Sequence, residues 1–366
     1  MNGWRLLAVL LALLVASSAA ADTRPGALER YGIDAQKVTV SGLSSGGYMA
    51  VQLGVAYSRV FSAVGVVAAG PYGCASTDRG LSGNVNRAVG PCMAGGYTWI
   101  QKWQCWTFWA SCPGADGPDA SASIALARSS AARHVIDPIS QLARQRVFLL
   151  SGKKDTTVHP KVVDALEGFY AAFVPASNMK HERLDQAAHT FPTDGFPRGN
   201  DCALAAPPYV SDCKYDGAKQ LLSHAYGPLH PRNDGAAKGS LLEFDQTSFV
   251  PGGTGAGMAD RGYIYVPSAC TGTPGAACAL HVALHGCKQS AAEVGKDFVE
   301  GAGYNRWADT NAIVVLYPQV STSRDNPQTC WDWWGYTGSA WHEKRAPQMA
   351  TIVAMVNRLT SPPRER

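Results

Sequence analysis

The feature that most constrains this chain is a serine in a tight turn between a predicted strand and a predicted helix. The β-branched residues from Val38 lead into Gly42-Leu43-Ser44-Ser45-Gly46, which fits the pattern G-x-S-x-G, and helical spacing follows from Tyr48 to Tyr57. The turn has no room for a Cβ on either side of the serine, so glycine is needed there. It raises the serine Oγ above the sheet, beside the free N–H groups of the following helix. Ser44 is therefore the candidate nucleophile.

A carboxylate stands at the end of a later predicted strand. Apolar runs predict buried strands over 61–69 and 146–151, and the second run ends in a glycine turn that is followed by Asp155. A side chain there projects from the carboxyl end of the sheet, where an acid can orient a catalytic histidine. Asp137 is the rival acid. It precedes Pro138 in a predicted turn, where a local backbone hydrogen bond explains it.

A histidine completes the set in the expected chain order. After a helix predicted over 160–173 and a short polar–apolar alternation, the loop sequence Ala187-Ala-His-Thr-Phe-Pro-Thr193 carries His189. The order Ser, Asp, His is that of α/β-hydrolases, so Ser44, Asp155 and His189 form the predicted triad. His159 and His181 are the alternatives, but one is too near the acid along the chain and the other lies inside a predicted strand.

The order of the predicted strands indicates a circular permutation. An ordinary α/β-hydrolase has several strands ahead of its nucleophile, whereas the stretch 22–38 has room for almost none. The missing strands are predicted in the second part of the chain, over 241–244, 262–266, 280–284 and 312–317, with a closing helix over 347–359. We therefore predict the α/β class and a circularly permuted α/β-hydrolase fold, with a mostly parallel central sheet flanked by helices.

One strand of the second part leads into a loop with its own chemistry. The strand over 280–284 runs directly into His285-Gly286-Cys287. In this fold such a loop supplies one backbone donor of the oxyanion hole, and the residue after the nucleophile supplies the other. The predicted donors are the N–H groups of Ser45 and Cys287.

The beginning of the sequence has the features of an export signal. Arg5 gives a positive start, 6–15 is almost unbroken apolar sequence, and Ala19-Ala20-Ala21 is a small-residue cleavage site. The apolar run is shorter than the roughly 20 residues that a membrane span needs. We expect a secreted protein, extracellular or periplasmic, cleaved near Ala21. Residues 22–366 are expected to form one catalytic domain, with halves of about 22–235 and 236–366.

The ten cysteines suit an oxidising compartment. Four pairs are close in sequence: Cys74/Cys92, Cys105/Cys112, Cys202/Cys213 and Cys270/Cys278. Spacing does not fix connectivity, but Cys287 and Cys330 are left over, and we predict that they bond to each other. No C-x-x-C pair has histidines nearby, so neither a metal site nor a cofactor is expected. The small, dispersed net charge of +4 argues against a nucleic-acid partner.

Two groups of tryptophans could cover the site. Trp99, Trp103, Trp106 and Trp109 fall near helical spacing, and we interpret them as packing a small cap against the sheet, with substrate contact as the alternative. Trp331, Trp333 and Trp334 are predicted substrate-binding residues in an apolar cleft wall. Packing at a sheet edge is the competing interpretation for this second group.

The motifs together resemble one family. An early Gly-Leu-Ser-Ser-Gly-Gly-Tyr-Met elbow, Ala188-His-Thr-Phe-Pro-Thr193, a late Leu284-His-Gly-Cys-Lys-Gln289, Leu316-Tyr-Pro-Gln319 and Cys330-Trp-Asp-Trp-Trp334 are similar to those of polyhydroxybutyrate depolymerases with a permuted catalytic domain. The resemblance implies the same triad and oxyanion donors, no cofactor, and hydrolysis of poly(3-hydroxybutyrate) or its oligomers to short 3-hydroxybutyrate products. Many extracellular members carry a separate polymer-binding domain, which is not expected here, so amorphous polymer or soluble oligomer is the safer substrate.

Two other functions compete with this hypothesis. A secreted feruloyl or acetyl esterase acting on plant polysaccharide would share the His-Gly-Cys and Cys-Trp-x-Trp signatures. A non-catalytic binding protein could keep the same fold, but all five predicted catalytic positions hold chemically competent residues. The hypothesis of a secreted serine esterase is therefore preferred over both.

Overall fold

The structure is a computed structural model that describes residues 26–77, 79–96, 99, 102, 103, 107, 117–253, 256–271 and 278–362. The predicted export signal lies outside these residues, so its cleavage stays a prediction. Trp106, Trp109 and the predicted Cys105/Cys112 pair also lie outside them. In the part of the chain that is described, no helix is both long enough and apolar enough to cross a membrane.

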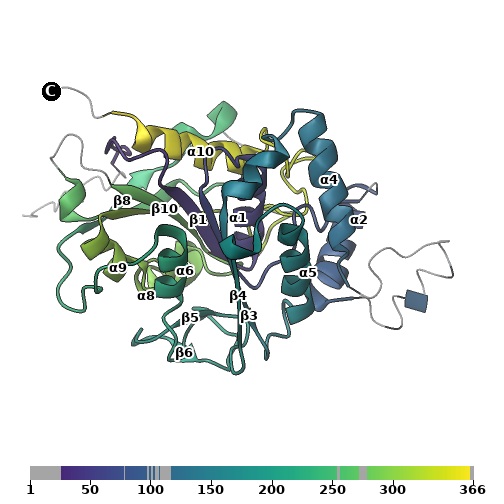
Figure 1. The fold of residues 1–366 in the computed structure, drawn as a ribbon, viewed down its shortest axis with the longest axis horizontal. Helices are drawn as coiled ribbons and strands as arrows, with labels where there is room; N and C mark the ends of the chain where they lie inside the picture. The colour runs from purple at the N-terminus through teal and green to yellow at the C-terminus, as the bar shows by residue number, and fades with distance from the viewer. Residues whose placement is uncertain are drawn as a thin grey trace, which may run out of the picture.

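A single eight-stranded sheet runs through the centre of the molecule (Figure 1). Across the sheet, the strands lie in the order β4 (Met179–Leu184), β3 (Arg146–Gly152), β2 (Ala63–Val67), β1 (Val38–Leu43), β10 (Ala279–Leu284), β11 (Ile313–Tyr317), β9 (Arg261–Val266) and β8 (Ser240–Asp245). The first six are parallel, and β9 and β8 add an antiparallel edge. Each strand that the sequence predicted is present.

The sheet divides in the middle according to position in the chain. All strands on one side of the β1–β10 pair come from the first part of the chain, and all strands on the other side come from the second part. In this pair Val38 lies opposite Leu280 and Gly42 opposite Leu284. The second part therefore supplies the strands that are missing ahead of the nucleophile, which confirms the predicted permuted order.

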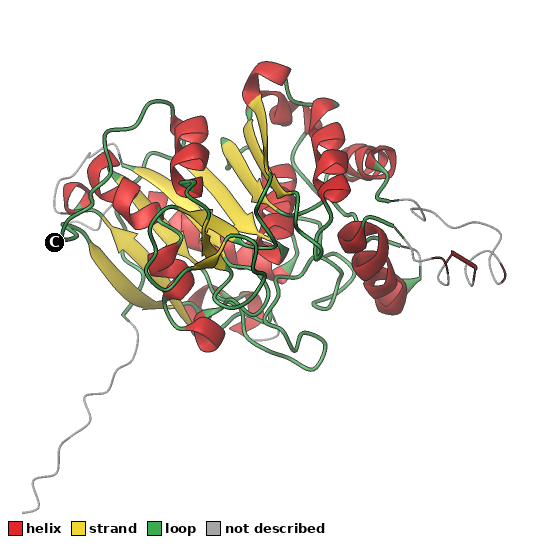
Figure 2. Cartoon of the chain, turned by 90° about the horizontal axis from the view of Figure 1, so that it is seen from below, coloured by secondary structure: helices red, strands yellow, loops and turns green. Residues whose placement is uncertain are grey.

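Helices cover both faces of the sheet (Figure 2). One core holds side chains of α1 (Ser45–Ala56), α4 (Ala120–Ala132), α5 (Pro160–Ala171) and α10 (Pro347–Thr360). The other holds side chains of α6 (Gly217–Tyr226), α8 (Asp297–Gly301) and α9 (Tyr304–Asn311). Strand side chains alternate between them: Val147 and Leu149 face the first core, and Phe148 and Leu150 the second. Both faces of the parallel sheet are buried, as βαβ connections require.

Four of the five predicted disulfides are present: Cys74–Cys92, Cys202–Cys213, Cys270–Cys278 and Cys287–Cys330. Every cysteine among the described residues is paired. The first bond joins the loop between β2 and α2 (Gly80–Val89) to the π-helical turn Gly90–Ala94, which follows α2. The last joins two loops of the second part of the chain that are 43 residues apart.

Two features differ from the sequence-based expectations. A small sheet of β5 (Phe191–Thr193), β7 (Val210–Asp212) and β6 (Asn200–Asp201) was not predicted, because strands of two or three residues are too short to show an alternating pattern. The second difference concerns the predicted tryptophan cap: the prediction that it packs against the sheet is wrong for Trp99 and Trp103. The side chains of Trp99 and Trp103 are 77% and 61% exposed, so they do not pack against the sheet. The short helix α7 (Ala291–Val294) follows the His285–Cys287 loop.

Candidate active site

Ser44 occupies the sharp turn that the sequence predicted. It lies between β1 and α1 with φ 54° and ψ −121°, a left-handed conformation that is costly for a residue with a Cβ. Its N–H donates to the Val67 carbonyl at 2.9 Å, which fixes the turn to the next strand. A Cβ on Gly42 would lie 2.3 Å from the carbonyl of Gly46. The glycines are therefore required by close packing within the turn itself.

The loop after β10 lies directly against this turn. A Cβ on Gly46 would lie 2.4 Å from the carbonyl oxygens of Leu284 and His285. A Cβ on Gly286 would lie 3.5 Å from the Ser44 Cβ, an ordinary contact distance. The nucleophile turn and the predicted oxyanion loop, which come from opposite parts of the sequence, thus form one packed unit.

Asp155 and His189 form a buried pair. One carboxylate oxygen, Oδ2, lies 2.7 Å from the imidazole Nδ1, and the other, Oδ1, accepts the N–H groups of Thr157 and Val158, each at 2.8 Å. The side chains are 1% and 8% exposed. An acceptor-only carboxylate held in this way requires a proton on Nδ1 and leaves Nε2 as the basic nitrogen. That is the tautomer a histidine needs to act as a general base.

The rival residues have other partners. The Asp137 carboxylate accepts the Arg59 N–H at 2.9 Å and pairs with the Lys344 ammonium, so it joins loops and is not in the candidate site. His159 is exposed and caps α5 through its Nδ1. His181 lies in β4, as predicted, and bonds to groups on neighbouring elements.

The oxyanion loop is held by a neutral histidine. His285 is fully buried, and its Nδ1 lies 2.7 Å from the Gly286 carbonyl oxygen, while its Nε2 accepts the Val320 N–H at 3.4 Å. Burial lowers the pKa of His285 to about 4, partly offset by the bond to Gly286, so the ring is uncharged near neutral pH. Among the described residues, no group accepts the N–H of Ser45 or of Cys287. Both are available as donors.

The three tryptophans after Cys330 do not share one environment. Trp331 is fully buried, and its indole N–H donates to the His285 carbonyl at 3.0 Å. It therefore packs beneath the oxyanion loop and does not line the cleft, which corrects the predicted substrate contact. Trp333 stacks on Tyr48, with ring centroids 3.9 Å apart and planes inclined by 7°. Trp334 is half-buried and meets Trp333 edge to face.

A groove of about 340 Å³ connects these aromatic rings with the oxyanion loop. It is lined by residues of α2, of the turn Gly90–Ala94 and of the loops joined by the Cys287–Cys330 bond: Val85, Ala88, Val89, Met93, Cys287, Asp325, Asn326, Pro327, Gln328, Cys330, Trp333 and Trp334. The α2 residues were not predicted to take part. Their spacing along one helix face was the available signal, but sequence does not show which partner that face meets.

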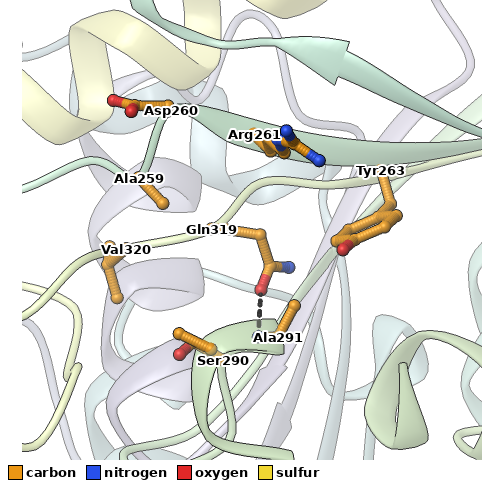
Figure 3. A pocket seen from close by; sticks show the side chains of 9 residues that line it. Ala259, Asp260, Arg261, Tyr263, Ser290, Ala291, Gln319 and Val320 are labelled. Atoms are coloured by element: carbon orange, nitrogen blue, oxygen red, sulfur yellow. Dashed lines mark hydrogen bonds between the residues drawn. The ribbon is translucent and has the colours of Figure 1, made fainter. Parts of the chain in front are cut away.

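A second pocket, of about 300 Å³, contains none of the predicted site residues (Figure 3). It opens between the start of β9 and the segment that follows the oxyanion loop, and the Gln319 side chain points across it to accept the Ala291 N–H at 2.8 Å.

In the described residues, one cluster has metal-ligand spacing, formed by Asp164, Glu167 and His181. Arg183 already pairs with both carboxylates of this cluster, and the cluster lies outside the candidate site.

A mostly parallel sheet with a serine turn at the carboxyl end of its central strand defines an α/β-hydrolase. A family model described as Esterase PHB depolymerase matches residues 264–362. The chain is 39% identical to the polyhydroxybutyrate depolymerase of Talaromyces funiculosus, over 96% of this chain and 98% of that protein. The chain belongs to the polyhydroxybutyrate depolymerase family.

Other relatives agree with this assignment. The poly(3-hydroxybutyrate) depolymerase of Delftia acidovorans is 44% identical over 90% of this chain, and the chain spans 60% of that relative's length. The crystal structure of PHB depolymerase from Penicillium funiculosum superposes with a TM-score of 0.77 at 36% identity, covering 91% of this chain and 98% of that one. A PHB depolymerase variant complexed with R3HB trimer gives a TM-score of 0.78 at 37% identity, with the same coverage.

Proposed function

We propose that this chain is a serine esterase that hydrolyses the ester bonds of poly(3-hydroxybutyrate) or its oligomers to short 3-hydroxybutyrate products. The observation that carries the proposal is the buried Asp155–His189 pair, at the same sheet edge as the Ser44 turn, in a chain of this family. The relatives are named for polyester hydrolysis, which favours this substrate over plant polysaccharide.

The proposed mechanism assigns one step to each group. His189 Nε2 takes the proton of Ser44 as its Oγ attacks an ester carbonyl, and Asp155 stabilises the imidazolium that forms. The N–H groups of Ser45 and Cys287 hold the resulting oxyanion. The imidazolium then protonates the departing alkoxide, which leaves as an alcohol. Water, activated by the same histidine, releases the 3-hydroxyacyl group as an acid and restores the serine.

The groove beside the oxyanion loop is the proposed subsite for the polymer chain. A polyester presents methyl groups and carbonyls but no charge along its length, so an apolar wall with few polar groups suits it. Val85, Val89, Met93, Trp333 and Trp334 supply that wall. Cys287 and Cys330 also line the groove, and the disulfide between them joins the wall to the proposed oxyanion donor.

We also propose that the enzyme acts after export, with residues 1–21 removed and residues 22–366 acting as one catalytic unit. The disulfides support an oxidising compartment, because reduced thiols are the rule in the cytosol. The mechanism above balances its protons and bonds with water as the only co-reactant, so no metal or organic cofactor is proposed.

Product analysis tests the proposal directly. The mature chain is incubated with amorphous poly(3-hydroxybutyrate) and, separately, with a feruloyl ester, and the soluble products are identified by mass spectrometry. We expect 3-hydroxybutyrate monomer and short oligomers from the polyester and much slower release of ferulate. Ser44→Ala is the matched control and should release neither. Rapid ferulate release with an unchanged polyester would replace the proposal by the plant-polysaccharide alternative.

A further inference from the structure

Gln289 is a buried polar residue to which the mechanism above gives no role. Its side chain is almost inaccessible, and three hydrogen bonds saturate its two N–H donors and engage its oxygen. Oε1 accepts the Gly286 N–H at 2.7 Å, and Nε2 donates to the carbonyls of Pro208 at 2.8 Å and Tyr209 at 3.1 Å. These partners also fix the orientation of the amide, because only its oxygen can accept an N–H and only its nitrogen can donate to carbonyls.

The side chain joins two segments that each adjoin a predicted catalytic group. The Tyr209 carbonyl also accepts the Phe191 N–H at 2.8 Å, and Phe191 begins β5 two residues after His189. At the other end, Gly286 directly precedes the proposed donor Cys287. One amide therefore connects the loop of the base to the loop of the oxyanion donor, across the two parts of the permuted chain.

The hydrogen bonds hold both sides of Gly286. Gln289 binds its N–H, and the protonated Nδ1 of His285 binds its C=O at 2.7 Å. That C=O belongs to the same peptide unit as the Cys287 N–H, and in a planar trans peptide the two point in opposite directions. Holding the carbonyl on one side therefore directs the Cys287 N–H to the other, and holding the preceding N–H prevents the unit from turning.

We propose that Gln289 is a positioning residue for the oxyanion hole. Its side chain keeps Gly286, and through it the Cys287 N–H, at the location where charge develops when Ser44 attacks. The inference rests on the proposed esterase mechanism. Its energetic basis is that a buried amide with all of its bonds made resists displacement, whereas a hydrocarbon in its place would leave the Gly286 N–H and the Pro208 carbonyl without their partner and the Tyr209 carbonyl with only the Phe191 N–H.

The first test compares two buried glutamines. Gln289→Leu removes the clamp. Gln145→Leu is the control, because Gln145 is equally buried and its Nε2 donates to the carbonyls of Gly54 and Phe61 at 2.8 and 3.0 Å, outside the candidate site. On a short nitrophenyl ester, Gln289→Leu should lower kcat about 10- to 100-fold with KM changed less than about twofold, because a displaced donor is missed mainly in the transition state. Gln145→Leu should lower the melting temperature and leave kcat within about twofold.

A second variant serves if Gln289→Leu fails to fold. Gln289→Glu keeps the shape. When protonated, the new carboxyl still accepts the Gly286 N–H and donates to one carbonyl, but when ionised it repels the carbonyls of Pro208 and Tyr209. The ratio of variant kcat to wild-type kcat should therefore fall as pH rises from 5 to 9. A purely structural role predicts a ratio that does not depend on pH among folded proteins.

The outcomes separate this inference from the proposed function. If kcat of the folded Gln289 variants stays within about twofold of wild type at every pH, or if Gln145→Leu loses as much kcat, the positioning role is overturned. The short ester makes this result independent of whether polyhydroxybutyrate is the substrate. If Ser44→Ala retains ester hydrolysis, the serine mechanism itself is wrong, whatever the glutamine variants do.

Discussion

Two places in this molecule bring together a serine, a histidine and a carboxylate. Ser44, Asp155 and His189 follow the carboxyl ends of β1, β3 and β4, which meet at one edge of the parallel sheet. In the second place Ser151 Oγ lies 3.2 Å from His181 Nε2, and His181 Nδ1 lies 2.9 Å from a carboxylate oxygen of Glu167. The second set has the residue types and the order of contacts of a hydrolase triad.

The two serines differ in their backbone. Ser44 stands in a left-handed turn between a strand and a helix, with Gly286 against it and beside a Ser45 N–H that has no acceptor in the described part of the chain. Ser151 lies inside β3, between two parallel neighbours, and is paired with Arg183 of β4. Ser151 therefore has the extended backbone of a strand and does not precede a helix N-terminus, as Ser44 does. Ser151 also lines none of the pockets described above.

The two carboxylates differ as well. Asp155 is sealed from solvent and accepts two backbone N–H groups in addition to His189, so its position is fixed. The Glu167 side chain is 40% exposed and shares one oxygen between His181 and Arg183. Residue identity and contact order are thus insufficient to make a triad. The turn, its free donors and a fixed acid separate the candidate site from its structural counterpart.

The largest expected difference between the two sets comes from removing each serine in turn. Ser44→Ala should lower kcat for a short nitrophenyl ester by about 10⁶, as when a serine hydrolase loses its nucleophile. Ser151→Ala should leave kcat within about twofold, because Ser151 lies inside a strand and lines none of the described pockets. The measurement is steady-state kinetics on both purified variants, with circular dichroism to establish folding. A large loss in the folded Ser151 variant would give the second set a role in the reaction.

The acids offer the next largest contrast. Asp155→Asn should lower kcat by about 10⁴, because an amide can present its N–H₂ to His189 and stabilise the wrong tautomer. Glu167→Gln should leave kcat within about twofold, since the side chain is exposed and its ion pair with Arg183 contributes little. Asp137→Asn is a second control and should act on stability alone. Wild-type activity in Asp155→Asn together with an inactive, folded Asp137→Asn would transfer the acid role.

The sequence predicted most of the fold because the information lay in local patterns. Buried strands of five to seven residues are continuous apolar runs, and the elbow has a fixed spacing of glycines. The permuted order followed from what was missing ahead of Ser44. Four disulfides followed from spacing and elimination.

The rest depended on contacts that no local pattern carries. The burial of Trp331 is decided by the distant carbonyl of His285, and the exposure of Trp99 by the absence of a partner surface for it among the described residues. Gln289 is the last residue of a motif that the sequence shows, but its hydrogen bonds to Pro208 and Tyr209 span about eighty residues of chain. Sequence spacing could not distinguish these environments, because each depends on how the two parts of the chain meet.

The groove gives a smaller contrast between the two serines. Among the described pockets, the groove includes Cys287 of the Ser44 site, and none is lined by Ser151. Trp334→Ala should lower hydrolysis of a 3-hydroxybutyrate oligomer about tenfold and that of a short nitrophenyl ester less than about twofold, because only the longer substrate reaches a remote subsite. Trp331→Ala, which removes a buried packing residue, should instead reduce both activities and the melting temperature. Equal losses on both substrates for Trp334→Ala would show that it only packs.

A third buried histidine, bonded to two hydroxyl groups and to no carboxylate among the described residues, extends the comparison to stability. His281 of β10 is fully buried, with Nδ1 at 2.8 Å from Thr39 Oγ1 and Nε2 at 2.7 Å from Ser41 Oγ. Burial lowers the pKa of His281 to about 3. The unfolded chain takes up its proton near the ordinary pKa of about 6.5. The neutral folded form is therefore fully favoured above pH 6.5 and loses stability as pH falls toward 3.

The expected slope is about 1.4 kcal/mol of unfolding free energy per pH unit for this one histidine, a tenfold change in the folding equilibrium constant. His281→Gln should therefore make the slope of unfolding free energy against pH smaller by about this amount between pH 6 and pH 4.5. The measurement is urea denaturation of wild type and variant at a series of pH values. Groups that titrate alike in both proteins, His285 among them, cancel in the difference between the two slopes. The kcat of the folded variant should stay within about twofold of wild type, because Ser41 and His281 are fully buried, where a substrate does not reach them. Parallel slopes would mean that His281 is protonated in the folded protein, and a carboxylate or water would then have to reach a site that the structure seals.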